Sequence, residues 1–159
     1  MKNKELERSE SLQTYKRWDA VAYGDNKFVA VSYDGYITHS ADGVTWSEPV
    51  AVGATAWYAV IYANKRFVVI GNGGYITTSA DGITWSEPTS KSQDDLRSIS
   101  FTGDGVFVVV GNNGDVITST DGVDWSSPVR INAHNWYNIT YGSGRIVAVG
   151  YNGDIIYTK

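Results

Sequence analysis

The sequence contains no cysteine, and its 159 residues include only one methionine, three prolines and two histidines. Without cysteine there can be no disulfide bond and no thiolate metal site. With only two histidines, His39 and His134, the sequence offers no His/His/carboxylate set that could bind a metal ion. The sequence also lacks a Gly-x-Ser-x-Gly nucleophile elbow and a phosphate-binding loop. We therefore expect no metal ion and no cofactor.

Basic residues are also scarce, and they are not clustered. The formal net charge is −4 and the pI is near 5.0, so we expect no nucleic-acid partner and no attraction to an anionic membrane. No apolar run approaches the roughly 18 residues needed to cross a bilayer. The start from Met1 to Glu7 has no apolar stretch of the kind found in secretion signals. We expect no membrane insertion, and the cellular location stays open.

Glycine and aromatic residues are abundant instead, and they recur at a fixed interval. The chain has 17 Gly, 11 Tyr and 6 Trp, a composition typical of short aromatic-rich strands joined by many turns. Four copies of one unit begin at Trp18, Trp57, Leu96 and Trp136, at intervals of 39 or 40 residues. The predicted units are 18–56, 57–95, 96–135 and 136–159, preceded by a segment 1–17.

Each copy predicts four short strands. The second stretch is continuously apolar, as in Val29-Ala30-Val31, and is followed by a turn with glycine at Gly35, Gly74, Gly114 or Gly153. Four strands in about 40 residues are typical of a propeller blade. The sequence thus predicts an all-β fold, a small four-bladed β-propeller in a single domain. Pro49, Pro88 and Pro128 each follow a repeated Trp by three residues, which predicts that the Trp-led strand forms the rim.

The fourth copy ends at Lys159, before its rim strand. Counting back one repeat from Trp46 reaches the segment 6–12, which predicts that this segment completes the last blade and closes the ring. The alternative is a charged tail beside an open last blade, which would favour pairing with another chain.

The first three copies end in Ser-x-Asp-Gly-x-x-Trp, at 40–46, 79–85 and 119–125. This stretch resembles the Asp-box (BNR) repeat of sialidase-type propellers, although that family has one more residue between Asp and Gly. The longer repeat also resembles those of phage tail and bacterial surface proteins. The resemblance implies structural turns. An Asp that accepts backbone N–H groups and a buried Trp suffice to explain the motif. We assign this structural role to Asp42, Trp46, Asp81, Trp85, Asp121 and Trp125.

Catalysis is not expected. A sialidase-like site needs an arginine cluster, a Tyr/Glu nucleophile pair and an acidic proton donor. Arg66 and Arg145 fall in turns between first and second strands, on the opposite face from Arg17 and Arg97, so these side chains cannot converge.

Ligand binding is the better-supported function. We expect it on the face where the turns between second and third strands lie, together with the links between blades. Aromatic rings and short amides mix there, as in sugar or peptide recognition. The predicted ligand-binding residues are Tyr33, Trp57, Tyr58, Asn72, Tyr75, Asn112, Asn113, Asn135, Trp136, Tyr137, Tyr151 and Asn152. Trp18, Trp57 and Trp136 recur in register, so plugging the junctions between blades is an equal alternative for them. The leading hypothesis is a non-catalytic, lectin-like glycan-binding module. The alternative is an assembly module that binds a protein partner or forms a homo-oligomer.

Overall fold

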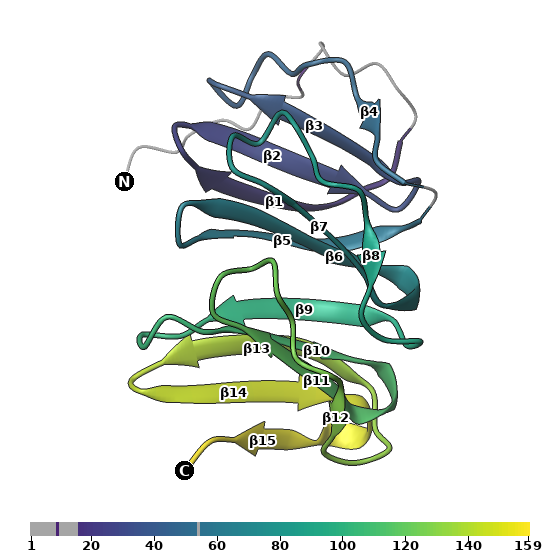
Figure 1. Ribbon diagram of the computed structural model, residues 1–159, viewed down its shortest axis with the longest axis vertical. Helices are drawn as coiled ribbons and strands as arrows, with labels where there is room; N and C mark the ends of the chain where they lie inside the picture. Colours follow the sequence, from purple (N-terminus) through teal and green to yellow (C-terminus); the bar gives the residue numbers. More distant parts are fainter. Residues whose placement is uncertain (1–8, 10–15, 54) are drawn as a thin grey trace.

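The computed structural model describes residues 9, 16–53 and 55–159. These residues form four antiparallel sheets arranged one after another (Figure 1). The first sheet contains β1 (Trp18–Gly24), β2 (Lys27–Ser32), β3 (Tyr36–Ser40) and β4 (Val50–Ala51). The second contains β5 (Trp57–Ala63), β6 (Arg66–Gly71), β7 (Tyr75–Ser79) and β8 (Thr89–Ser90). The third contains β9 (Leu96–Phe101), β10 (Phe107–Gly111), β11 (Asp115–Ser119) and β12 (Val129–Arg130). The fourth contains β13 (Trp136–Gly142), β14 (Arg145–Gly150) and β15 (Ile155–Tyr157).

The all-β prediction of about four propeller blades is confirmed. Each blade pairs its strands in chain order, so every connection within a blade is a hairpin. In the first blade the β1–β2 turn places Asp25 and Asn26 at φ of 46° and 57°. Two left-handed residues in succession give the hairpin geometry that matches the natural twist of paired strands. The same pair of left-handed residues recurs at Asn64 and Lys65 in the second blade.

The rim strands differ from the prediction that they begin at the repeated Trp. The rim strands β4, β8 and β12 contain two residues each and begin one position after the proline. The Trp side chains pack inward instead: the rings of Trp85 and Phe67 lie 6.5 Å apart, and those of Trp125 and Phe107 lie 6.2 Å apart. Regular pairing starts only after the proline because proline has no N–H to donate.

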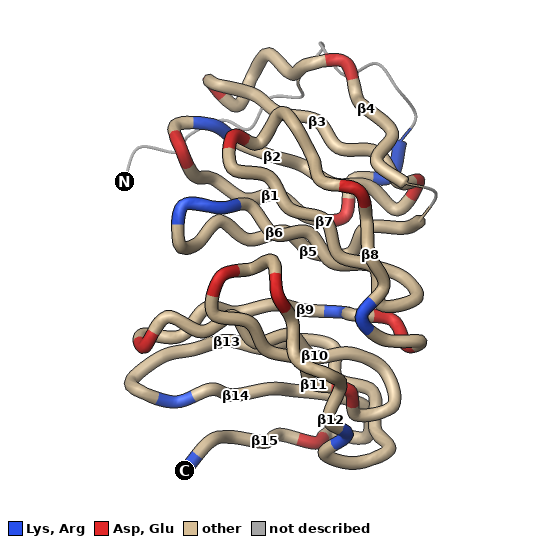
Figure 2. The backbone as a smooth tube through the Cα atoms, in the orientation of Figure 1, with Lys and Arg blue, Asp and Glu red and all other residues tan. Residues whose placement is uncertain are grey.

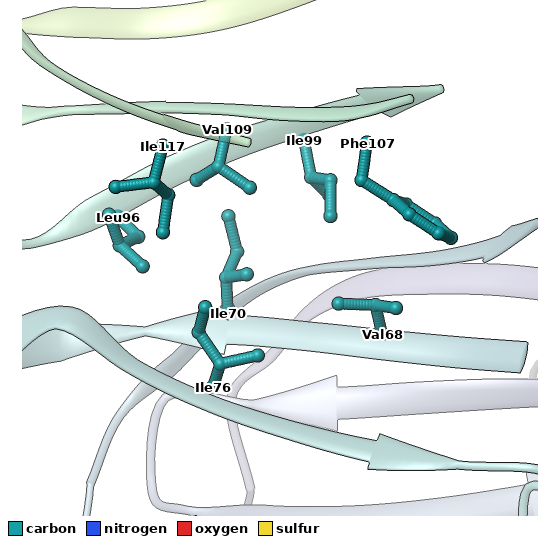
Figure 3. Close-up of a cluster of buried hydrophobic side chains, with 8 residues drawn as sticks. All are labelled: Val68, Ile70, Ile76, Leu96, Ile99, Phe107, Val109 and Ile117. Atoms are coloured by element: carbon teal, nitrogen blue, oxygen red, sulfur yellow. The ribbon is translucent and has the colours of Figure 1, made fainter. Parts of the chain in front are cut away.

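The hydrophobic core lies between the blades. Three clusters of buried side chains join the first blade to the second, the second to the third and the third to the fourth. Figure 3 shows the middle cluster, in which Val68, Ile70 and Ile76 face Leu96, Phe107 and Val109. The first strands of neighbouring blades are in extensive contact, which puts β1, β5, β9 and β13 on the inner side of the stack.

The stack is open in the part of the chain that the structure describes. No buried cluster joins the fourth blade to the first among these residues, and the two blades lie at opposite ends of the long axis (Figure 1). The predicted closing strand, 6–12, lies outside the described residues apart from Ser9. The Ser9 hydroxyl donates to the carbonyl of Val44, in the first blade, at 2.5 Å. Within the described ranges, no helix is long and apolar enough to cross a membrane.

Candidate functional site

The candidate site lies where the turns between second and third strands meet the inner strands. Each inner strand carries a β-bulge one residue after its opening position. The bulged residues are Asp19, Tyr58, Arg97 and Tyr137. A bulge leaves one residue out of the ladder and redirects its side chain, and bulges are frequent beside functional sites. These equivalent positions hold an acidic residue, a basic residue and two tyrosines, so the site is not fourfold symmetric.

The adjoining turns are compact and depend on left-handed residues. Three of them are single 3₁₀ turns: η1 (Asn72–Gly74), η2 (Asn112–Gly114) and η3 (Tyr151–Gly153). Asn113 and Asn152 sit at their centres with φ of 54° and 60°. Glycine follows because there is no room for a side chain: a Cβ on Gly74 would lie 2.0 Å from the carbonyl oxygen of Ser92. The turns η1 and η2 are thereby held against the links that lead to the next blade, whereas a Cβ on Gly153 in η3 would meet nothing within 4 Å.

A row of stacked side chains crosses the first three blades at this face. The guanidinium carbon of Arg17 lies 4.8 Å from the ring centroid of Tyr33. The rings of Tyr33 and Tyr58 are 6.1 Å apart, and the guanidinium carbon of Arg97 lies 4.5 Å from the Tyr58 ring. These separations are typical of cation–π and aromatic pairs. We call Arg17, Tyr33, Tyr58 and Arg97 the Arg–Tyr row. Tyr33 is 46% exposed, so one end of the row is open to solvent.

Asp95 holds the end of the row at Arg97. Its carboxylate accepts hydrogen bonds from the Asn72 amide at 2.8 Å, the Gly73 N–H at 3.0 Å and the Arg97 guanidinium at 2.8 Å. Arg97 in turn donates to the side-chain oxygen of Asn112 at 3.2 Å. Partial burial, together with the charge of Asp95, raises the pKa of the Tyr58 phenol. The row is therefore fixed in place by hydrogen bonds from three different loops.

A second polar cluster lies beside it, between the second and third blades. Arg130 donates to Asp94 at 2.6 Å and to Asp115 at 3.0 Å. Asn113 donates through its side chain to Asp94 at 2.7 Å and through its backbone to Asn135 at 2.9 Å. Predicted ligand residues thus serve partly to tie the turn η2 to its neighbours. Figure 2 shows acidic and basic residues interspersed over the blades rather than gathered by sign.

A hollow of about 310 Å³ opens beside the Arg–Tyr row. It is lined by Tyr33, Asp34, Thr55, Ala56, Tyr58 and Asn72. The lining of this hollow combines two tyrosine rings with a carboxylate, a hydroxyl and an amide group. Such a lining suits a polar ligand with some apolar surface. No group of three or more His, Cys, Asp or Glu side chains that could hold a metal ion occurs within residues 9, 16–53 and 55–159.

The fourth blade carries two exposed tyrosines. Tyr137 and Tyr151 are 49% and 57% exposed, and Asn152 beside them is exposed as well. Tyr75, 39% exposed, begins β7 directly after η1. Of the predicted ligand residues, Tyr33, Tyr58 and Asn72 are brought together around one hollow, whereas Tyr137 and Tyr151 lie apart from it.

Two predicted ligand residues are placed elsewhere. Trp57 and Trp136 are fully buried and belong to the clusters between blades, so their side chains plug the junctions and cannot contact a ligand. The prediction failed for them because an aromatic residue in register serves packing and binding equally well in a sequence. The prediction also omitted Asp95, Arg97 and Arg17 from the site. The departure of Asp95-Leu96-Arg97 from the aromatic pattern of the other copies was the available signal.

The aspartates of the repeated turns lie at hairpins on the other face. The Asp42 carboxylate accepts N–H groups of Val44 and Thr45 at 2.8 and 2.7 Å, and these hydrogen bonds lower its pKa to about 2. Asp81 has the same partners in its own turn, Ile83 and Thr84, and its pKa is also lowered to about 2. The carboxylates therefore brace the turns in their ionised form.

Comparison with known proteins identifies the fold. No protein-family profile matches the sequence, and no curated protein does. Among solved structures, the computationally designed Ika4 protein is 12% identical, with a TM-score of 0.75 over 98% of each chain. The β-propeller domain of Myceliophteria thermophila Cps50 (Swd1) is 12% identical, with a TM-score of 0.66 over 88% of this chain and 50% of that one. YCF48 bound to the D1 peptide is 19% identical, with a TM-score of 0.66 over 91% of this chain and 49% of that one.

The chain thus spans about half the length of the Cps50 domain and of YCF48. At these identities the likeness extends to the fold alone, and the sialidase-type identity of the repeat stays a prediction. By its sheets and by these structural neighbours, the chain is a β-propeller protein.

Proposed function

We propose that the chain is a non-catalytic recognition module that binds an extended segment of a partner protein at the Arg–Tyr row and the hollow beside it. The observation that carries this proposal is the row itself, four side chains in contact across three blades, with Arg97 held by Asp95. Tyr and Arg are the residues that most often dominate the binding energy of protein interfaces. Side chains already held in one geometry lose little entropy on binding, which favours affinity.

The chemistry of the hollow fits a peptide backbone and its side chains. The lining of the hollow includes the Asp34 carboxylate, which can accept hydrogen bonds, and the Asn72 amide, which has both donor and acceptor atoms. Arg17 and Arg97 each cover one face of a tyrosine ring, so these rings offer edges and hydroxyls rather than open platforms. Sugar stacking needs an open ring face, and the row is for this reason better suited to protein. A structure of the same fold, YCF48, holds a peptide, which adds support.

Glycan binding is the second candidate, and the observation that favours it is the fourth blade. Tyr137 and Tyr151 are half exposed, with Asn152 close by in the chain. An exposed ring with neighbouring amides is the usual arrangement for the apolar face and the hydroxyls of a sugar. We also propose that the Asp-box turns are structural and that the chain carries no catalytic residue.

The test is a selection from a displayed library of random twelve-residue peptides against the immobilised chain, followed by fluorescence anisotropy of synthetic peptides. We expect enriched peptides whose affinity falls at least about tenfold in Tyr58→Ala and in Asp95→Ala, because truncating a central contact typically costs more than about 1.4 kcal/mol. Ile83→Ala, at an exposed position in an Asp-box turn on the other face, is the control and should bind as the wild type does. Peptides that bind Tyr58→Ala as tightly as wild type would refute the assignment of the row.

A glycan array probed with the wild type, Tyr58→Ala and Tyr137→Ala separates the two candidates. Glycan binding that is lost in Tyr137→Ala and kept in Tyr58→Ala would favour the fourth-blade site. Binding of neither peptides nor glycans would remove both proposals.

A further inference from the structure

Each blade has two faces, because its sheet packs between two neighbours. The preceding face packs on the blade before it, and the following face packs on the blade after it. In the second blade, Val60, Tyr62, Phe67 and Val69 belong to the preceding face, and Val68, Ile70 and Ile76 belong to the following face. Among the described residues, two faces of the four-bladed stack pack on no other blade: the preceding face of the first blade and the following face of the fourth.

The following face of the fourth blade consists of core-type residues that are exposed. Val31, Ile70 and Val110 occupy one equivalent position in the first three blades and are 0%, 0% and 1% exposed. Val149 occupies that position in the fourth blade and is 42% exposed. At the paired position on the next strand, Ile37 and Ile76 are 2% and 3% exposed, whereas Ile155 is 66% exposed.

The preceding face of the first blade shows the same pattern. Val21 is 61% exposed, whereas its equivalents Ile99 and Ile139 in the third and fourth blades are 9% and 6% exposed. Tyr23 on the same face is 58% exposed. A hollow of about 350 Å³ opens there, lined by Trp18, Asp19, Ala20, Val21, Ala30 and Trp46. Trp18 is only half-buried, although Trp57 and Trp136 at the equivalent position are fully buried.

We infer that these two faces bind each other between two copies of this chain. The following face of the fourth blade of one copy packs on the preceding face of the first blade of the other, and the reciprocal contact forms at the opposite ends. The contact repeats the one that each pair of neighbouring blades already makes within the chain, with aliphatic β-branched residues on one side and aliphatic and aromatic residues on the other. Burying Val21, Tyr23 and Ile155 would remove their exposed apolar surface from water.

The curvature of the stack determines how many copies close the ring. A head-to-tail contact gives a closed ring if the rotation closes and a filament if it does not. The chain superimposes over 88% of its length on 50% of the Cps50 β-propeller domain. Since propellers are closed rings, its four blades follow roughly half a turn. Two copies of the four-bladed stack therefore complete one ring of eight blades. This contact lies on the blade faces, not at the Arg–Tyr row, so it can be tested separately from ligand binding.

The mass in solution tests the inference, measured by light scattering after size-exclusion chromatography. We expect twice the 17.4 kDa mass of one chain for the wild type. Val21→Asp and Ile155→Asp should each give the mass of one chain, because each change damages both contacts of the ring. Val129→Asp is the matched control, since Val129 is also 61% exposed but lies on the rim strand β12. It should keep the double mass. The circular dichroism spectra of all three variants should match that of the wild type, because the altered side chains are exposed.

Mixing the two variants tests the head-to-tail geometry. A pair made of one Val21→Asp chain and one Ile155→Asp chain contains one undamaged contact, so the mixture should partly regain the double mass, whereas neither variant alone does. A wild type with the mass of one chain at all concentrations would overturn the inference. So would a mass that keeps rising with concentration, which indicates a filament, or a double mass that survives in Ile155→Asp, which indicates a different contact.

Discussion

The guanidinium carbon of Arg97 lies 4.5 Å from the centroid of the Tyr58 ring, across the boundary between the second and third blades. Both residues occupy the same bulged position of their inner strands. The repeat therefore places the two side chains at equivalent positions of neighbouring blades. They form a cation–π contact because one copy has Tyr at this position and the next has Arg.

This contact predicts a perturbed titration at Tyr58. Burial and the Asp95 carboxylate both disfavour the phenolate and raise the pKa, whereas the Arg97 charge lowers it. Asp95→Asn should therefore move the Tyr58 titration to lower pH, and Arg97→Gln should move it to higher pH. Tyrosine ring resonances followed by NMR, with Tyr58→Phe for assignment, measure both shifts. A titration that is the same in all three proteins would show that the charges do not act on the ring.

The two buried tryptophans predict a difference in stability. The Trp57 indole N–H donates to the carbonyl of Val52 at 3.1 Å, whereas the Trp136 N–H has no hydrogen-bond partner within the described residues. Replacement of either by Phe removes similar packing, but only Trp57→Phe breaks a buried hydrogen bond. We expect Trp57→Phe to lower the free energy of unfolding by about 1 kcal/mol more than Trp136→Phe does. Urea titrations of the two variants measure the difference, and equal losses would contradict the assignment.

The clusters between blades predict which aliphatic residues contribute most to the free energy of unfolding. Ile76 is 3% exposed in the middle cluster, and Ile83 is 53% exposed in the turn that contains Asp81. Ile76→Ala should lower the free energy of unfolding by about 2–5 kcal/mol. Ile83→Ala makes the same chemical change and should cost less than about 0.5 kcal/mol. Chemical denaturation of both variants compares them directly. Similar losses would mean that the blades are not held together at this cluster.

The aspartates of the repeated Ser-x-Asp-Gly turns predict a loss of stability in acid. The lowered folded-state pKa values of Asp42 and Asp81, about 2 against an ordinary 3.8, mean that the folded chain binds protons less readily than the unfolded chain. Their contribution is present above pH 3.8 and is lost as the pH falls through about 2. Asp42→Asn/Asp81→Asn should therefore melt at a lower temperature than wild type at pH 7, with the gap narrowing towards pH 2. Asp104→Asn, in the exposed β9–β10 turn, should melt like wild type. A gap that is constant with pH would exclude the carboxylates as its cause.

The repeat was sufficient to predict the blades, because glycine and asparagine at fixed intervals fix each turn and the apolar stretch around Val109 can only be a covered strand. It did not predict that, within the described residues, the first and fourth blades lie apart. Closure depends on small rotations between neighbouring blades that add up over the chain, and no single residue encodes their sum. It also could not decide between packing and binding for Trp57, because the indole suits both. Tyr33 and Tyr58 were predicted, but their contacts with Arg17 and Arg97 were not, because the four residues come from different copies and meet only when the blades are stacked.

The most direct test of the account maps which face binds. A peptide selected against the chain is titrated into isotopically labelled protein, and backbone amide shifts are followed by NMR. We expect the largest shifts at Tyr33, Tyr58, the turn η1 and Arg97, with little change at Val44, Ile83 and Val123 in the Ser-x-Asp-Gly turns. Shifts concentrated at the Asp-box turns, with none in the Arg–Tyr row, would contradict it.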